Sequence, residues 1–347
     1  MAARNDLQRE AWLDGLKGFA ILLVILGHVL SGYINAGIYA EARHSFYMLR
    51  VWIYSFHMPL FFLLSGFTCT LAYCREDRLD VRRWGRQLLS LVWLYALYGV
   101  LQWCVKMAVP SLVNETYTLE SLQKMFVEPL GNFWYLYVLV VFYGIAALTR
   151  MHRWHPRWLL LAAALSIAAL TIHLSRYNLT WYRAQYHFFF FLMGSVLCRF
   201  RWPLRSRRVL GCCAMFLATA CWFYWFIGIR SWFSNWSFAI ALSTSLVLLY
   251  TFCRFPRLAG LRLFQLCGKY CMELYLLHTF FTAGLRSLLC QTPLLPWLSV
   301  ILNFALSTCI CLLLAIAARS VWWGSLFFRP ARFLSRLKDH QPLRPKP

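Results

Sequence analysis

The chain has 347 residues, of which 61% are hydrophobic, 18% aromatic and only 14% charged. This composition excludes an ordinary soluble domain and indicates a protein that crosses a lipid bilayer several times. The formal net charge of +23 does not indicate nucleic acid as a partner, because the basic residues lie in short segments between apolar spans and form no basic face.

Ten apolar spans follow one another along the chain and predict an all-α, polytopic membrane protein with about ten transmembrane helices. No small-residue cleavage pattern follows the first span, so we expect it to be retained rather than removed as a signal peptide. The spans lie near residues 16–36, 52–74, 87–107, 132–148, 157–174, 186–200, 209–228, 236–253, 268–288 and 297–318.

The segments between the spans alternate in basic content. Of the 35 Lys and Arg residues, 27 lie in the set of segments that includes both termini, and 8 lie in the other set. The positive-inside rule therefore predicts that both termini are cytoplasmic. We expect a membrane domain over residues 1–328 and a basic, disordered cytoplasmic tail over residues 329–347. No internal repeat typical of secondary transporters is visible.

The first span carries three ionisable residues, Asp14, Lys17 and His28. At about 100° per residue they project from one face of a helix, and His28 lies about 16 Å deeper than Lys17. That depth is near the middle of a hydrocarbon core about 30 Å thick, where an ionisable group marks a functional site by default. A neutral imidazole there suits a general base, and Asp14 is placed to pair with Lys17. The alternatives are a snorkelling Lys17 and a structural hydrogen bond of His28.

The second span holds His57 near its outer end and Ser65-Gly66 at greater depth. A glycine inside a membrane helix lets another backbone or a ligand approach closely. These residues therefore either contribute to a binding site or serve helix packing, with His57 at the membrane interface.

A cluster of arginines, Arg82, Arg83 and Arg86, directly precedes the third span. Guanidinium groups bind phosphates through paired hydrogen bonds. Together with a buried histidine, the cluster indicates a phosphate-bearing cytosolic substrate such as a nucleotide-containing thioester. The alternative is a topology signal that contacts anionic lipid headgroups.

Three further candidates lie in later spans. Trp134 opens the fourth span, where it belongs either to an aromatic belt or to a platform for a sugar. Glu273 and His278 lie inside the apolar ninth span, five positions apart on different faces, so either could meet the first helix.

The thirteen Cys residues lack the spacing of metal ligands. We therefore expect them to be small apolar residues of the helix contacts, and we expect no metal to be bound.

In order and spacing, these elements resemble the integral-membrane acyltransferase-3 family, which includes O-antigen, nodulation-factor and fucose O-acetylases. The resemblance covers nearly the whole chain. It rests on Lys17 followed eleven positions later by His28, on Phe-His-Met-Pro-Leu-Phe-Phe-Leu-Leu-Ser-Gly at 56–66, on Arg82-Arg83-x-x-Arg86, and on Tyr275-Leu-Leu-His278.

The resemblance implies ten transmembrane helices and acyl transfer from cytosolic acyl-CoA, usually acetyl-CoA, to a hydroxyl of a carbohydrate or glycolipid. It implies a multi-pass location in a bacterial inner membrane. His28 takes the catalytic position, Lys17 that of its basic partner, and Arg83 and Arg86 those that bind CoA. Many relatives have Arg where this chain has Lys17, and lysine lacks the bidentate fork of arginine.

We therefore expect a membrane O-acyltransferase in which His28 is either a general base or the carrier of an acyl group. Lys17, Ser65 and Tyr275 are candidate donors to the developing oxyanion. The competing hypothesis is a proton-coupled transporter or exporter of a glycan or small solute, in which buried ionisable residues relay protons. A third hypothesis is a non-catalytic membrane scaffold. The sequence leaves open whether the chain forms a homo-oligomer.

Overall fold

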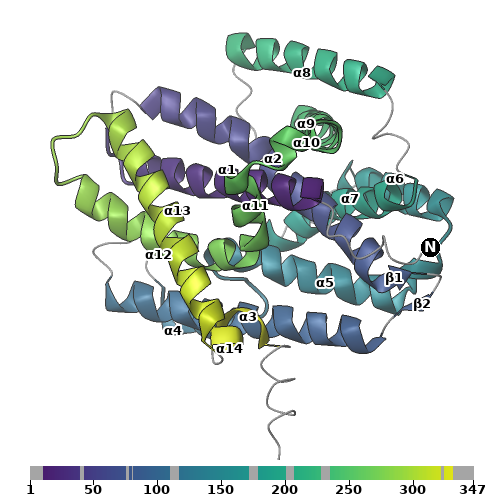
Figure 1. Ribbon diagram of the computed structural model, residues 1–347, viewed down its shortest axis with the longest axis horizontal. Helices are drawn as coiled ribbons and strands as arrows, with labels where there is room; N and C mark the ends of the chain where they lie inside the picture. The colour runs from purple at the N-terminus through teal and green to yellow at the C-terminus, as the bar shows by residue number, and fades with distance from the viewer. Residues whose placement is uncertain are drawn as a thin grey trace, which may run out of the picture.

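The computed structural model describes residues 11–39, 43–75, 78–79, 81–109, 117–171, 179–200, 207–227, 235–321 and 324–330 (Figure 1). The described residues are almost entirely helical, which confirms the predicted all-α class. The long helices are α1 (Ala11–Asn35), α2 (Arg43–Tyr73), α3 (Val81–Ala108), α5 (Trp134–Leu148), α6 (Pro156–Thr171), α7 (Leu179–Phe200), α8 (Arg207–Ile227), α9 (Asn235–Arg254), α12 (Cys271–Leu289) and α13 (Pro296–Ser320).

Short elements join the long helices. They are the helices α4 (Leu119–Gln123), α10 (Pro256–Ala259), α11 (Arg262–Lys269) and α14 (Gly324–Phe328), and 3-10 turns at Gly131–Phe133 and Met151–Arg153. Two-residue strands β1 (Cys74–Arg75) and β2 (Arg78–Leu79) pair antiparallel between α2 and α3, with Cys74 opposite Leu79.

Each of the ten predicted spans overlaps one long helix, although the ninth, residues 268–288, begins in the short helix α11. Among the described residues, six helices are long and apolar enough to cross a membrane: α1, α2, α3, α5 with the turn before it, α9 and α13. The number of ten crossings and the cytoplasmic side of the termini stay predictions. Of the predicted tail, only residues 329 and 330 lie within the described residues.

Helix α1 lies in the middle of the bundle, where it packs against α2, α9, α11, α12 and α13 (Figure 1). Its buried residues include Leu16, Ile21, Ile25 and Leu30, each essentially inaccessible to solvent. Burial on several sides explains how α1 can carry ionisable residues, because neighbouring helices rather than lipid surround them.

Glycines let neighbouring helices touch through their backbones. A Cβ on Gly18 would overlap the carbonyl of Phe264, and one on Gly268 would overlap the carbonyl of Asp14, so α1 and α11 are in backbone contact. A Cβ on Gly66 would overlap the carbonyl of Phe191 on α7 in the same way. Of the two alternatives for Ser65-Gly66, this contact supports helix packing at Gly66, and small residues at such contacts are typical of membrane helices.

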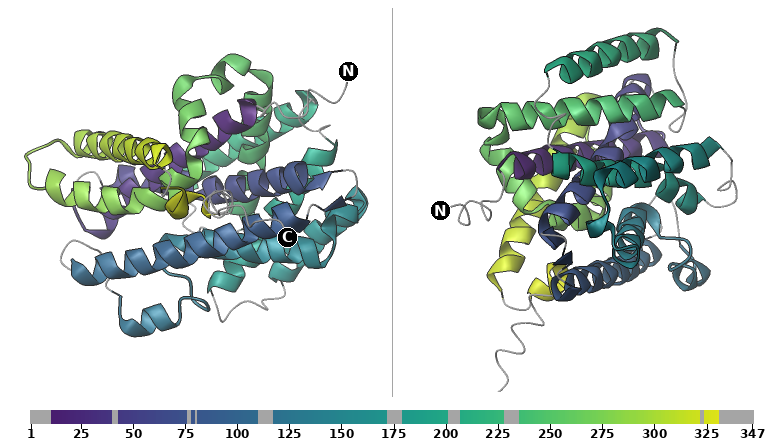
Figure 2. Two further views of the ribbon diagram at one scale, coloured as in Figure 1. Left: turned by 60° about the horizontal axis from the view of Figure 1, so that its bottom comes forward. Right: turned by 90° about the vertical axis from the view of Figure 1, so that its right-hand side faces the viewer.

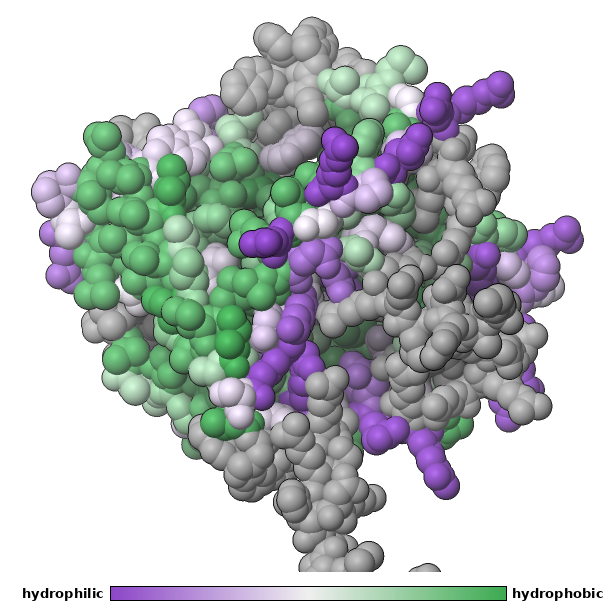
Figure 3. All heavy atoms as spheres, viewed as in Figure 1, coloured by the Kyte–Doolittle hydropathy of each residue, from purple (hydrophilic) through white to green (hydrophobic). Residues whose placement is uncertain are grey.

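The outer surface is strongly apolar over α12 and α13, whereas hydrophilic residues gather toward the centre and right of the same view (Figure 3). On α13, the side chains of Ile301 and Leu313 are 57% and 66% exposed. Helix α8 lies outermost, beside α9 (Figure 2). Exposure of so many apolar side chains to water is unfavourable, whereas the hydrocarbon core of a bilayer accommodates them.

Candidate active site

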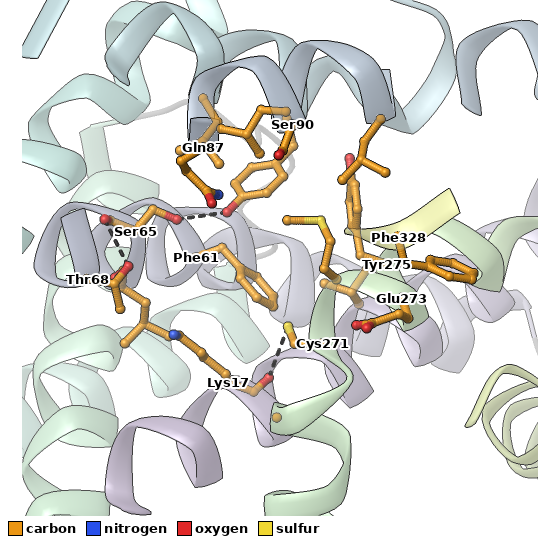
Figure 4. A pocket seen from close by; sticks show the side chains of 18 of the residues that line it. Lys17, Phe61, Ser65, Thr68, Gln87, Ser90, Cys271, Glu273, Tyr275 and Phe328 are labelled. Carbon is orange, nitrogen blue, oxygen red and sulfur yellow. Dashed lines mark hydrogen bonds between the residues drawn. The ribbon is translucent and has the colours of Figure 1, made fainter. Parts of the chain in front are cut away.

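One cavity among the described residues has a volume of about 500 Å³ and lies between α1, α2, α3, α5 and α12 (Figure 4). We call it the large cavity. One end of its wall is polar, with Lys17 on α1, Thr68 on α2 and Gln87 on α3. The other end is apolar, with Val24, Met58 and Leu94 on the same three helices. The cavity thus has a polar mouth and an apolar inner end.

Three cations and one carboxylate line the mouth: Lys17, Lys269, Arg329 and Glu273. The Glu273 carboxylate accepts hydrogen bonds from Arg319 Nε at 2.8 Å and Nη2 at 2.5 Å, and it lies 3.4 Å from Nε of Arg329. Because the carboxylate is paired with Arg319, the mouth keeps a positive charge that suits an anionic group.

Two predicted oxyanion donors also line the large cavity. The hydroxyls of Ser65 and Tyr135 lie 2.8 Å apart, and the Tyr275 hydroxyl donates to the carbonyl of Asn132 at 2.5 Å. In Figure 4, Ser65 and Tyr275 approach the cavity from α2 and α12, and Lys17 reaches toward Thr68. Both hydroxyls are therefore at the wall, but that of Tyr275 is held by the backbone.

The second cavity has a volume of about 280 Å³ and is called here the small cavity. It lies between α1, α3 and α12, and its wall includes His28, Ser31, Asn35, Gln102, Lys106, Thr279 and Arg286. Hydroxyl, amide and cationic groups lie beside apolar side chains such as Val105 and Phe280 in this wall, and no carboxylate belongs to it in the described part of the chain. Such a set of donors and acceptors suits a hydroxylated ligand.

The two cavities follow one another along the same helices. Val24 in the large cavity and His28 in the small one are one turn apart on α1, and Tyr275 and Thr279 are one turn apart on α12. His28 and its neighbour His278 therefore lie where the inner end of the large cavity approaches the small cavity.

Aromatic and imidazole rings from α2 and α12 lie around His28. The Tyr54 hydroxyl lies 3.4 Å from His28 Nδ1 and accepts a hydrogen bond from Ser31 at 3.0 Å. The rings of His28 and His278 are 4.9 Å apart, centroid to centroid, and those of Tyr54 and His57 are 4.7 Å apart. The structure thus brings His57 and His278 to His28, although no group of three or more His, Cys, Asp or Glu residues in the described ranges could hold a metal ion.

Hydrogen bonds to backbone carbonyls assign the tautomers of His57 and His278. His57 Nδ1 lies 2.8 Å from the carbonyl of Ile53, and His278 Nδ1 lies 2.8 Å from that of Tyr275. Because a carbonyl oxygen only accepts, Nδ1 carries the proton in each ring, and Nε2 of the neutral ring is an acceptor.

The other predicted residues lie outside both cavities. Asp14 is buried on α1 beside α11. Trp134 packs against His187, with ring centroids 5.3 Å apart, and under Arg183. Arg82 and Arg86 are exposed on α3, where Arg86 directly precedes the lining residue Gln87. The side chain of Arg83 lies outside the described residues.

The sequence analysis missed Lys269 and Arg329 at the mouth and Arg319 beside it, because it counted them only as topology signals. One signal was available: a carboxylate at the position of Glu273, inside an apolar helix, requires a cationic partner. The sequence does not say which cation this is, since Arg319 is 46 positions away.

Comparison with known proteins gives a match to a family model described as an acyltransferase domain over residues 10–316. Nodulation protein NolL of Mesorhizobium japonicum is 28% identical over 202 residues, which cover 56% of this chain and 52% of that protein. Nodulation protein NolL of Sinorhizobium fredii is 26% identical over 196 residues, which cover 55% of this chain and 49% of that protein. The chain thus spans about half the length of the curated relatives it matches. No solved structure matches the chain.

Proposed function

The chain belongs to the acyltransferase-3 family, and from this premise we propose that it transfers an acyl group, such as acetyl, from cytosolic acyl-CoA to a carbohydrate hydroxyl. The observation that carries the proposal is the arrangement of two cavities along α1, α3 and α12, with His28 where they approach each other. A two-substrate transfer needs two binding sites that share one reacting point.

The large cavity is proposed to bind the acyl donor. In the predicted orientation its mouth faces the cytoplasm, and Lys17, Lys269 and Arg329 would bind the phosphates of CoA. Arg82, Arg83 and Arg86, at the start of α3, would attract the donor toward this mouth. The apolar inner end would then receive the rest of the donor and bring the thioester toward His28.

Lys17 takes a different role in this proposal from the one that the family resemblance implied. It lines the mouth of the large cavity, whereas His28 lines the small cavity. Eleven residues of helix separate them by about 16 Å. We therefore assign Lys17 to the charged end of the donor rather than to the reacting atoms.

The small cavity is proposed to bind the acceptor from the outer side. Its hydroxyl and amide groups, on Ser31, Asn35 and Gln102, can exchange hydrogen bonds with a carbohydrate or the sugar of a glycolipid. His28 belongs to the same wall, so an acceptor hydroxyl bound there lies next to the imidazole.

In the proposed reaction His28 removes the proton of the acceptor hydroxyl as its oxygen attacks the thioester carbonyl. The new C–O bond forms, the C–S bond breaks, and the CoA thiolate takes the proton from the imidazolium. In the second possible route a nitrogen of His28 attacks first and carries the acyl group until the acceptor displaces it.

Binding and transfer by the purified protein test this proposal. We expect His28→Ala to bind acetyl-CoA and transfer nothing. We expect Ser90→Trp, which fills the large cavity, to lose binding, whereas Leu89→Trp, at a side chain 58% exposed on the same helix, keeps it. If the wild-type protein has no affinity for acyl-CoA, the proposal fails. Proton-gradient-dependent movement of a glycan or solute would then favour the transporter hypothesis.

A further inference from the structure

His278 on α12 is fully buried and faces His28 on α1. Their ring centroids are 4.9 Å apart, and the ring planes are inclined by 49°. Nδ1 of His278 is bound to its own helix, through the carbonyls of Tyr275 at 2.8 Å and Leu274 at 3.2 Å. The ring is therefore fixed in orientation, with Nε2 on the side away from these carbonyls.

Nε2 of His278 has no hydrogen-bond partner among the described residues. In the tautomer set by the two carbonyls it is an acceptor, and a buried acceptor without a donor is unfavourable. The unpaired Nε2 of His278 is explained if a hydrogen-bond donor forms next to it during the reaction. The neighbouring ring of His28 becomes such a donor when it is protonated, because both nitrogens of an imidazolium carry a proton.

The other polar groups near His28 include hydroxyls, a further imidazole and two cations. Tyr54 on α2 lies near Nδ1, His57 on α2 packs against Tyr54, and Lys106 on α3 and Arg286 on α12 share the wall of the small cavity. Within the described ranges that wall holds no carboxylate. In hydrolase triads a carboxylate stabilises the imidazolium. Here Nε2 of His278, a neutral acceptor, can take the place of that carboxylate.

Resting on the proposed function, we propose that His278 is a positioning residue, whose Nε2 accepts a hydrogen bond from His28 once His28 has taken the acceptor's proton. The proton stays on His28 and passes to the CoA thiolate as the C–S bond breaks, so His278 begins and ends the cycle neutral. The hydrogen bond stabilises the imidazolium in a site where the described cavity wall holds no carboxylate.

Two replacements separate the acceptor from the volume of the ring. His278→Gln can place its amide oxygen near the position of Nε2, whereas His278→Leu offers no acceptor. We expect His278→Leu to lower kcat by about 10²-fold, because the imidazolium of His28 loses one hydrogen bond while His28 itself remains the base. We expect KM for acetyl-CoA to change little, since His278 does not line the large cavity. His278→Gln should recover at least a tenth of the wild-type kcat.

A matched control is available in His187 on α7. It is also buried, its Nδ1 also lies near a carbonyl of its own helix, that of Arg183 at 2.6 Å, and its ring packs against Phe62 and Trp134. We expect His187→Leu to keep kcat within about twofold of the wild type. If His278→Leu does not fold, His278→Asn, which keeps a donor near the Nδ1 position but not the distal acceptor, takes its place with the same expected loss.

The inference is overturned if His278→Leu or His278→Asn keeps the wild-type kcat, or if His278→Gln loses as much as they do. A rise in KM with an unchanged kcat would also overturn it, because it would indicate a binding role. These outcomes differ from failure of the proposed function, in which the wild-type protein itself transfers no acyl group.

Discussion

Glu273 on α12 and Arg319 on α13 form a buried ion pair beside the mouth of the large cavity. The carboxylate is 2% exposed and the guanidinium 18%, with N–O distances of 2.8 and 2.5 Å. Arg319 also lies over the ring of Tyr270, 3.8 Å from its centroid, and donates to the carbonyl of Lys269 at 2.7 Å. The pair therefore joins α13 to the corner between α11 and α12.

The ion pair predicts an asymmetric effect on stability. Arg319→Met leaves the carboxylate of Glu273 buried with only the more distant Arg329, so we expect a loss of about 3–5 kcal/mol in the free energy of unfolding. The double variant Glu273→Gln/Arg319→Met removes the charge as well and should be the more stable of the two. Denaturant unfolding in detergent measures both; equal loss in both variants would contradict the pairing.

The backbone contact between α1 and α11 predicts that Gly18 does not tolerate a side chain. Gly18→Ala forces the two backbones apart, and we expect a loss of about 1–3 kcal/mol in unfolding free energy. Gly144 on α5 is the matched control, because a Cβ there meets nothing within 4 Å. Gly144→Ala should be neutral or slightly stabilising. A stable Gly18→Ala protein would show that the contact is looser than described.

The charged mouth predicts which cations hold the donor. Lys269→Gln/Arg329→Gln should raise the Kd for acetyl-CoA at least tenfold, since each is expected to lose a charge-assisted hydrogen bond to phosphate. Arg82→Gln/Arg86→Gln should have a smaller effect, because both side chains are exposed outside the cavity, and this effect should fade at high salt. Calorimetric titration gives both constants. The reverse order of effects would place the phosphates on the arginine cluster instead.

The hydroxyl of Tyr54 predicts a separate contribution to turnover. It lies 3.4 Å from His28 Nδ1 and is itself bound by Ser31. Tyr54→Phe removes a polar partner that orients the imidazole, and we expect kcat to fall about tenfold. Acetyl-CoA binding, measured on the same preparation, should stay unchanged because Tyr54 does not line the large cavity. Unchanged kcat would exclude this contact from the reaction.

If the acceptor binds in the small cavity, filling this cavity should weaken binding of the acceptor but not of acetyl-CoA. Ala283→Trp fills this cavity and should raise KM for the acceptor while the Kd for acetyl-CoA is kept. Leu288→Trp, at a side chain 63% exposed on the same helix, is the control and should change neither constant. Steady-state kinetics with a soluble carbohydrate acceptor provides the measurement. Loss of acetyl-CoA binding in Ala283→Trp would show that the donor occupies the small cavity.

The sequence by itself determined the features that depend on local periodicity. Runs of apolar residues locate the long helices of the described chain, because a long apolar segment satisfies its backbone hydrogen bonds internally when it is helical. The same 3.6-residue period puts Lys17 and His28 on one face of α1 and separates Glu273 from His278 on α12. The family could also be recognised from the order of a few short motifs.

Only the tertiary structure decided which faces meet, because helix contacts depend on the crossing of segments far apart in the chain. It paired Glu273 with Arg319 and placed His278 against His28, 250 positions away. It also left Arg86 exposed while the next residue, Gln87, lines the large cavity. One residue is a rotation of about 100° on a helix, so the sequence locates the arginine cluster but not the side of α3 that faces the cavity.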